Sequence, residues 1–544
     1  MIEAASRGWR GYGLLLLLCL GLYLPGLASL PVTDRDEARF AQATRQMLES
    51  GDFLHIRFLD EPRNAKPAGI YWLQAASVAA LSDAGSNAIW PYRVPSLLGA
   101  VGAVLLTFEF GARLCGRPAA LCGAALLASS LGLVAEAHLA KTDAVLLFCC
   151  VAAQGALAEI ARAARGGAVS WGWPFLFWTA EAAAVLVKGP VAPALALLTC
   201  LALVLAMRDA RWLRQLRPLW GVPVFLAFVL PWLIAISLAT SGAFLNQSMG
   251  HDFLGKIVGA QESHGAWPGT YLLLLPLTFW PGSLLLLAAG VGAWRERRDP
   301  AVRFLVAWAV PFWLVLELVP TKLPNYLLPA FPALALLAGR AAVDASADLP
   351  AWGRHVVASL WGLLSLAVAG SLALAPHWLG QGFDAVELAA AAAVVVVAAL
   401  AVRALRHAVT PGLALGAAVL ALLVVPALAY EAPRLDRLWL SRAAAAMVAR
   451  VVPRGAPVIV AGYDEPSLVF LLGSRTEILP PQQAAQALAK TPGALALVAG
   501  RASNAFAAAA AGAGMTPQAI GAVSGLNYSN GKTMTLTLYR SAPE

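Results

Sequence analysis

Charged side chains are scarce in this chain, and their scarcity excludes an ordinary soluble fold. Asp, Glu, Lys and Arg make up 13% of its 544 residues, whereas apolar residues make up 60% and the mean hydropathy is +0.70. A soluble core of this length holds far less apolar surface. The composition therefore predicts a polytopic α-helical membrane protein.

Cysteine is also rare, and the sequence has no fixed-period repeat and no low-complexity linker. The six cysteines lie in apolar segments or beside arginine-rich loops, at Cys19, Cys115, Cys122, Cys149, Cys150 and Cys200. This placement indicates neither a disulfide framework nor a spaced set of metal-binding thiolates. We interpret the cysteines as packing residues.

Roughly fourteen apolar stretches lie between residues 12 and 430, and most reach the length that a bilayer demands. The net charge of +9 is carried by arginines in short loops, which is the positive-inside pattern and does not indicate nucleic-acid binding. These loops contain Arg7 and Arg10, Arg113 and Arg117, Arg162 and Arg165, Arg208 to Arg217, Arg295 to Arg298, and Arg403 to Arg406.

The order of the loops predicts which stretch fails to cross. Residues 68–82 are short and have no basic flank, and if they do not span, Arg113 and Arg117 fall in the cytoplasm. About thirteen spans then remain, with the N-terminus inside and the C-terminus outside. If the loop at 136–142 were cytoplasmic, all the apolar stretches of 68–135 could span the membrane, and Asp143 would lie away from the outer face. Reading residues 1–30 as a signal peptide leaves the orientation unchanged.

The composition changes near residue 431. An alanine-rich amphipathic stretch at 441–452 precedes the strand-like run 457–461, and helical and strand-like runs alternate through 533–539. Their apolar runs are too short to span a bilayer. We therefore expect a transmembrane domain over 1–430 and a small extracytoplasmic α/β domain over 431–544.

Five ionisable residues lie between positions 34 and 39, directly after the first apolar stretch, in a first outer loop that we place at 31–93. Such a cluster suits a phosphate, a metal ion or an amino sugar. The segment 36–49 also fits an amphipathic helix lying on the membrane, so some of its charges, Arg39 among them, could simply be solvated. Lys66 follows at the bilayer boundary, where snorkelling and a contact with a lipid phosphate explain it equally well.

Two further outer segments carry polar residues. The loop 241–268 contains His251 and His264 with nearby acids, a weak pattern for a divalent metal site because the histidines lack a tight spacing. The turn from Pro320 to Tyr326 fixes Lys322 and Tyr326 at the headgroup level between two prolines. Anchoring in the aromatic belt also explains Tyr326.

The predicted topology brings Arg93, Asp143 and Lys188 to the same outer face, and a charge at the kink Lys188-Gly189-Pro190 favours a functional role. Nucleotide sugars are not normally available there, so a lipid-linked sugar is the natural donor. The leaving phosphate gains negative charge, which cations and a metal ion can stabilise.

Several motifs together resemble the GT-C lipid-linked glycosyltransferases. The resemblance is closest to the family that transfers 4-amino-4-deoxy-L-arabinose to bacterial lipid A, glycosyltransferase family 83, which is related to the protein mannosyltransferases. It covers roughly residues 30–330. The matching motifs are Asp36-Glu37-Ala38-Arg39-Phe40-Ala41, Met47-Leu48-Glu49-Ser50-Gly51-Asp52, Lys66-Pro67, Asp143, Val187-Lys188-Gly189 and Lys322-Leu323-Pro324-Asn325-Tyr326.

The resemblance implies transfer of aminoarabinose from undecaprenyl phosphate to lipid A phosphates at the periplasmic face of the inner membrane, giving resistance to polymyxin and cationic peptides. We expect a monomer that also contacts membrane lipids. The expected site residues fall into four groups: catalytic Asp36, Glu37 and Asp143; lipid-phosphate-binding Lys66, Arg93, Lys322 and Tyr326; sugar- or acceptor-contacting Arg39, Lys188 and His264; and, for a divalent metal ion, Asp36, His251 and His264.

Two departures from the family pattern leave the sugar open. Ala65 stands where a Glu is expected before Lys66, and Pro320 and Thr321 stand where a second lysine is expected. The alternatives are transfer of mannose or another sugar to protein or glycan, and transport of a lipid-linked sugar through a helix broken at Lys188-Gly189-Pro190. Against transport, no inverted repeat is visible and the polar groups crowd one face.

Overall fold

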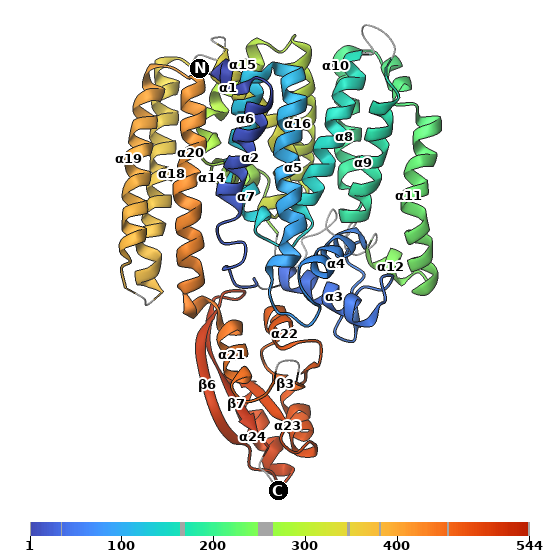
Figure 1. Cartoon of the computed structure of the whole chain (residues 1–544), viewed down its shortest axis with the longest axis vertical. Coiled ribbons are helices and arrows are strands. Elements are labelled where there is room, and N and C mark those ends of the chain that lie inside the picture. Colours follow the sequence, from blue (N-terminus) through green and yellow to red (C-terminus); the bar gives the residue numbers. More distant parts are fainter. Residues whose placement is uncertain are drawn as a thin grey trace.

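The computed structural model describes residues 2–33, 35–163, 169–248, 265–344, 349–379, 382–453 and 456–541. It consists of a helical bundle and a smaller domain that extends from one end of it (Figure 1). The N-terminus lies at the opposite end of the bundle from the smaller domain. Arg113 lies in the last turn of α5 (Trp90–Cys115) and Arg117 begins α6 (Arg117–Ser129), while Arg211 and Arg214 lie between α10 (Val191–Met207) and α11 (Pro218–Ala239).

Long apolar helices form the bundle. They and the shorter helices among them are α1 (Ile2–Ser6), α2 (Trp9–Tyr23), α5 (Trp90–Cys115), α6 (Arg117–Ser129), α7 (Leu131–Ala137), α8 (Asp143–Ala163), α9 (Gly172–Lys188), α10 (Val191–Met207), α11 (Pro218–Ala239), α12 (Ala243–Leu245), α14 (Thr270–Thr278), α15 (Leu286–Arg295), α16 (Pro300–Leu318), η4 (Pro324–Ala330), α17 (Phe331–Val343), α18 (Ala351–Trp378), α19 (Ala385–His407) and α20 (Pro411–Glu431).

The chain is a multi-pass membrane protein, as its composition predicts. Among the described residues, 8 helices are long and apolar enough to cross a bilayer, or up to 10 if each of two bent helix pairs is one span. The helices α2, α9 and α10, of 15, 17 and 17 residues, stand alongside them (Figure 1). The count of about thirteen spans stays a prediction.

Two helices of the first loop lie at the end of the bundle nearest the smaller domain (Figure 1): α3 (Asp36–Ser50) and α4 (Gly69–Leu81). At 13 residues, α4 is only about 20 Å long, well short of the roughly 30 Å hydrocarbon core. It is therefore not among the helices long enough to cross a bilayer, and the expectation that residues 68–82 do not span stays a prediction. The amphipathic pattern predicts that the apolar side of α3 faces lipid. Instead it is buried in protein, where the Phe40 and Tyr71 rings lie 5.3 Å apart.

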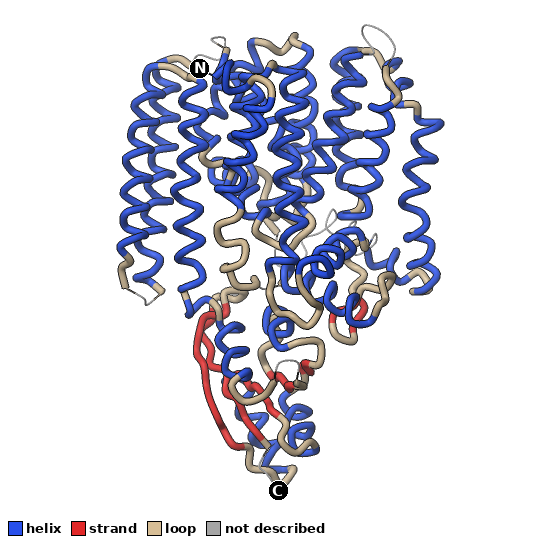
Figure 2. The backbone as a smooth tube through the Cα atoms, in the orientation of Figure 1, coloured by secondary structure: helices blue, strands red, loops and turns tan. Residues whose placement is uncertain are grey.

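The smaller domain begins after α20 and has the expected α/β character. Figure 2 shows its strands gathered in one sheet, of order β4-β3-β5-β7-β6. The β3 strand pairs in parallel with β4 and β5, and β7 pairs antiparallel with β5 and β6. Its elements are α21 (Leu440–Ala449), β3 (Val458–Ala461), α22 (Pro466–Leu472), β4 (Thr476–Ile478), α23 (Pro481–Lys490), β5 (Leu495–Ala499), α24 (Ser503–Gly512), β6 (Gln518–Asn527) and β7 (Lys532–Arg540).

Both faces of this sheet are covered, because alternate residues of a strand point to opposite sides. Val458 and Val460 pack on one side in a cluster that includes residues of α21 and α22. Ile459 and Ala461 pack on the other side with α23 and α24. The uninterrupted apolar run at 458–461 is therefore the pattern of a strand buried on both faces.

Close helix packing in the membrane domain depends on small residues. A side chain at Gly339 on α17 would overlap the carbonyl oxygen of Ala119 on α6, and a Cβ at Gly123 on α6 would lie 2.7 Å from the Ala335 oxygen. Small residues at such contacts let helix backbones approach closely. The α6–α17 contact therefore constrains the bundle at these two glycines.

The substitution Gly339→Val should destabilise the protein by about 1–3 kcal/mol, because an added side chain forces two close helices apart. The melting temperature of the purified protein in detergent measures this. Gly370→Val on α18 is the matched control, since a Cβ there meets no atom within 4 Å. Equal melting temperatures for the two variants would contradict the packing argument.

Candidate active site

A cavity of about 560 Å³ opens at the outer ends of the bundle helices. Its polar lining comes from four separate parts of the chain and includes Lys66, Asp143, Lys188, Asn325 and Tyr326. The remaining walls are largely apolar side chains of α9, α10, α11 and α16, among them Leu198, Phe225, Leu226, Leu230, Trp232, Leu233 and Phe312. The cavity thus joins a small charged region to a long apolar one.

Helix ends place the charged groups. Asp143 is the first residue of α8, and Lys188 is the last residue of α9, where Gly189 at φ +73° turns the chain towards α10. Lys66 precedes α4, and Asn325 lies in η4. A charge at a helix end stays out of the hydrocarbon core. Four mostly apolar segments can therefore each place a polar group at the outer end of the bundle, in one cavity.

Asp143 is the centre of the contacts. Its Oδ1 atom lies 2.5 Å from the Lys188 Nζ and accepts a hydrogen bond of 2.7 Å from the Asn325 amide. The two charged side chains are almost buried, at 3% and 12% exposed. The Lys188 ammonium also lies 5.3 Å from the centre of the Tyr326 ring, within range of a cation–π attraction.

Lys141 adds a third cation, which the sequence motifs do not include. Its Nζ atom lies 3.1 Å from Glu136 Oε1. Burial alone would lower the pKa of Lys141, but the carboxylates of Glu136, Asp143 and Asp36 outweigh it and raise that pKa above its ordinary value. Lys141 therefore stays positively charged beside the cavity.

Asp36 and Arg39 lie on the first turn of α3. Asp36 is exposed and close enough to Lys141 to contribute to its raised pKa. Arg39 is half-buried, and no side-chain contact among the described residues assigns it a role. Asp36 can thus act near the cavity, although it is not among the cavity's lining residues.

Glu37 and Arg93 form a fully buried pair. Arg93 donates to both Glu37 oxygens, at 2.7 and 3.0 Å, and its remaining donors reach the carbonyl oxygens of Leu27, Leu30 and Pro31. Both side chains are 0% exposed. All five guanidinium donors are therefore engaged, and this geometry does not favour the expected binding of a lipid phosphate by Arg93 or direct catalysis by Glu37.

Lys322 likewise serves the fold. Its ammonium donates to the carbonyl oxygens of Glu317, at 3.0 Å, and of Val319, so it fastens the end of α16. Burial lowers the pKa of Lys322. It is not among the residues that line the cavity, which argues against the expected contact with the carrier phosphate.

The expected metal ligands are only partly within the described chain. His251 and His264 lie outside the described residues, as does most of the outer loop 241–268. Across the ranges that the structure describes, no group of three or more His, Cys, Asp or Glu residues could hold a metal ion. The divalent metal ion stays a prediction.

The site combines two lysines with an apolar trough, so its chemistry suits an amphipathic anion. A phosphate could reach Lys66 and Lys188 through charge-assisted hydrogen bonds, while an attached hydrocarbon chain follows the apolar walls. Asp143, held by Lys188 and Asn325, supplies a fixed negative charge for a neighbouring amine or hydroxyl group. Asn325 belongs to the motif Lys322–Tyr326, but nothing in the sequence distinguishes its amide as a partner of Asp143.

The sequence is similar to those of known glycosyltransferases. Residues 7–243 match the family model described as dolichyl-phosphate-mannose-protein mannosyltransferase. A relative from Pseudomonas paraeruginosa, named undecaprenyl phosphate-alpha-4-amino-4-deoxy-L-arabinose arabinosyl transferase, is 32% identical over 337 residues, which cover 61% of this chain. The chain spans only 59% of that relative's length.

The crystal structures of ArnT from Cupriavidus metallidurans match nearly the whole chain. The apo structure has a TM-score of 0.78 at 20% identity and covers 98% of each chain. The structure bound to undecaprenyl phosphate has a TM-score of 0.76 at 19% identity and covers 96% of this chain and 97% of that one. The expected GT-C fold with its additional C-terminal domain is confirmed.

The substitution Glu37→Gln should cost about 3–5 kcal/mol at neutral pH, because it leaves the Arg93 charge buried without its partner. Burial alone would raise the pKa of Glu37, but Arg93 and the backbone donors of Thr33 and Ala140 lower it below its ordinary value of 4.5. A depressed carboxyl pKa stabilises the folded state above the unfolded value and loses that contribution as the pH falls through the folded value.

Melting temperatures in detergent between about pH 7 and pH 3 measure this effect. The natural protein should lose stability below about pH 4.5, whereas Glu37→Gln should start lower and change less in that window. Glu49→Gln, an exposed position on the same helix, is the control. Parallel curves for the natural protein and Glu37→Gln would refute the assignment.

Proposed function

We propose that this chain, a GT-C membrane protein by its fold, is a glycosyltransferase that moves 4-amino-4-deoxy-L-arabinose from undecaprenyl phosphate to a phosphate of lipid A. The observation that carries the proposal is the convergence of Lys66, Asp143 and Lys188 on one cavity with long apolar walls. A polyprenyl phosphate needs that division between a charged head and an apolar tail. The names of the curated relatives support the same donor.

In this proposal the donor phosphate binds where Lys66 and Lys188 face the cavity, beside Tyr326. Lys188 is paired with Asp143 in the structure, at 2.5 Å, so the phosphate competes with Asp143 for this ammonium. The polyprenyl chain follows the apolar side chains of α10, α11 and α16, such as Leu198, Phe225 and Phe312. Burial of the apolar polyprenyl chain supplies affinity, and the two lysines fix the position of the phosphate in the cavity.

The transfer exchanges one carbon–oxygen bond for another. An oxygen of the acceptor phosphate forms a bond to the anomeric carbon of the sugar, and the bond from that carbon to the carrier phosphate breaks. The electron pair stays on the carrier phosphate, where Lys66 and Lys188 stabilise the added charge. Lys141, nearby and positively charged, contributes to the same field.

A strong base is not needed for this reaction. The second pKa of a phosphomonoester is about 6, so the acceptor is largely ionised at neutral pH. Asp36 and Asp143 therefore position the sugar and the acceptor, and the amino group of the sugar gives either carboxylate a cationic partner. A divalent metal ion, if Asp36 or the histidines His251 and His264 bind one, would add further positive charge near the phosphates.

The location follows from the arginine-rich loops. They lie at the cytoplasmic side under the positive-inside rule, and the C-terminal domain and α4, which follows Lys66 of the cavity, lie at the other end of the bundle (Figure 1). We place the protein in the bacterial inner membrane with its site facing the periplasm. Aminoarabinose on lipid A lowers the negative charge of the surface, which gives resistance to polymyxin and cationic peptides.

A second candidate is transfer of mannose or another sugar to a protein or glycan. The match of residues 7–243 to the mannosyltransferase family model favours it. The cavity for a polyprenyl phosphate would be the same, and only the sugar and the acceptor would differ. Measurement of the product separates the two candidates.

The decisive assay expresses the chain in a polymyxin-sensitive bacterium that makes lipid-linked aminoarabinose but lacks its transferase. Mass spectrometry should find an aminopentose on lipid A with the natural chain, and at least tenfold less with Asp36→Asn or Lys66→Ala, since these remove a positioning carboxylate and a phosphate-binding cation. Asp60→Asn, an exposed position in the same loop, should retain the product. Unmodified lipid A from a well-expressed natural chain would reject the proposal and direct the search to protein glycosylation.

A further inference from the structure

The segment 138–142 joins α7 to α8 and carries Lys141, two residues before Asp143. Side chains of the first loop hold this segment at Ala140, which is completely buried. We propose that Gln74 and Thr44 are positioning residues that fix Ala140 and thereby orient Asp143 and Lys141 in the site. The inference deepens the proposed function and rests on it for its effect on transfer.

Both backbone groups of Ala140 are bonded to side chains. The Ala140 N–H donates to Glu37 Oε1 at 2.9 Å, and the Ala140 carbonyl accepts from Gln74 Nε2 at 3.1 Å. Thr44 donates its hydroxyl to Gln74 Oε1 at 2.7 Å, which fixes the orientation of the amide. Gln74 and Thr44 are 0% exposed, so water cannot replace these bonds.

The arrangement matters because the segment is neither helix nor strand. Its backbone groups need partners from elsewhere, and a buried carbonyl left without one costs the full desolvation of that group. Loss of the Gln74 amide would let Ala140 shift, and Asp143 lies only three residues later. Displacements of about 1 Å at a reacting group are enough to slow a transfer strongly.

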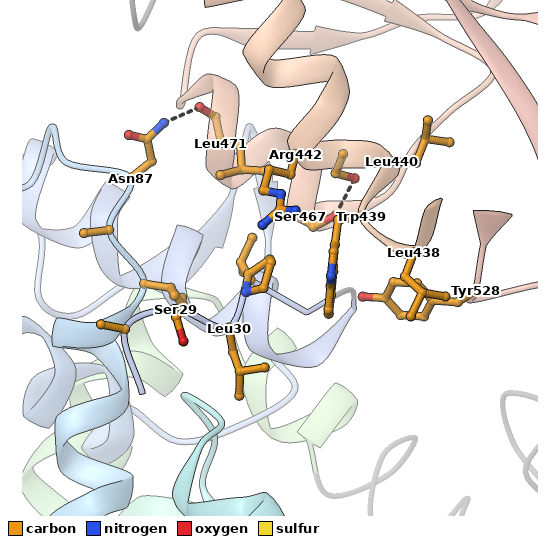
Figure 3. Close-up of a pocket in the computed structure, with 16 residues that line it drawn as sticks. Ser29, Leu30, Asn87, Leu438, Trp439, Leu440, Arg442, Ser467, Leu471 and Tyr528 are labelled. Carbon is orange, nitrogen blue, oxygen red and sulfur yellow. Dashed lines mark hydrogen bonds between the residues drawn. The ribbon is translucent and has the colours of Figure 1, made fainter. Parts of the chain in front are cut away.

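The C-terminal domain braces the same helix. Arg45, next to Thr44 on α3, donates to the Phe470 carbonyl at 2.6 Å and to the Ser86 carbonyl at 2.5 Å. Asn87 donates to the Leu471 carbonyl at 2.8 Å, at the border of the two domains (Figure 3). The C-terminal domain thus contacts α3 at Arg45. On the same helix, Glu37 bonds to Ala140 directly and Thr44 bonds to it through Gln74.

The test compares Gln74→Met with Gln154→Met. Gln154 is an equally buried glutamine with the same kind of contact, from Nε2 to Thr199 Oγ1 at 3.2 Å, but it lies inside the bundle away from the 138–142 segment. Gln74→Met should lower kcat about tenfold with little change in the donor KM, and should speed amide hydrogen exchange within 138–143 about tenfold. Gln154→Met should do neither.

Thr44 gives a second, milder test. Thr44→Val removes the hydroxyl at nearly constant shape, so it should lower kcat and speed the exchange to a smaller extent. Thr44→Ser keeps the hydroxyl and should match the natural chain in both measurements. Unchanged exchange within 138–143 in both Gln74→Met and Thr44→Val would overturn the inference, as would equal effects of Gln74→Met and Gln154→Met. If the natural chain transfers no aminoarabinose, the proposed function fails, and the exchange data still decide whether Gln74 holds the segment.

Discussion

The buried pair of Glu37 and Arg93 is the contact on which the outer end of the bundle depends. It joins the start of α3 to the start of α5, and its remaining hydrogen bonds reach the chain at 27–33 and at Ala140. Taking both charges out of water is costly, and only a full set of partners compensates for it. The pair therefore joins four segments, and one of them, at Ala140, leads into Asp143 of the candidate site.

The membrane explains why the site lies where it does. Charges are expensive inside the hydrocarbon core, so the helices carry Asp143 and Lys188 at their outer ends, where α8 begins and α9 ends. The apolar lengths of the same helices form the walls of the cavity. A lipid-linked donor meets the same boundary between polar and apolar surroundings, which is why one cavity can hold both its phosphate and its hydrocarbon chain.

The sequence predicted the fold class, the C-terminal α/β domain and four residues that line one cavity. Lys66, Asp143, Lys188 and Tyr326 were identifiable because charge or a positioned aromatic at the edge of an apolar span has few structural explanations. The pairing of Arg93 with Glu37 was not identifiable. In a sequence, an arginine whose guanidinium is buried among protein acceptors looks the same as an arginine that binds a phosphate. Lys141 and Gln74 escaped notice for a related reason, since their roles depend on contacts between segments distant in the chain.

A structure of the protein with undecaprenyl phosphate tests the central claim most directly. The account predicts density for the phosphate between the ammonium groups of Lys66 and Lys188, beside Tyr326, with the hydrocarbon chain along α10, α11 and α16. It also predicts that Lys188 loosens its contact with Asp143. A carrier phosphate bound elsewhere, with the Lys188–Asp143 pair unchanged and the cavity free of lipid, would contradict the account.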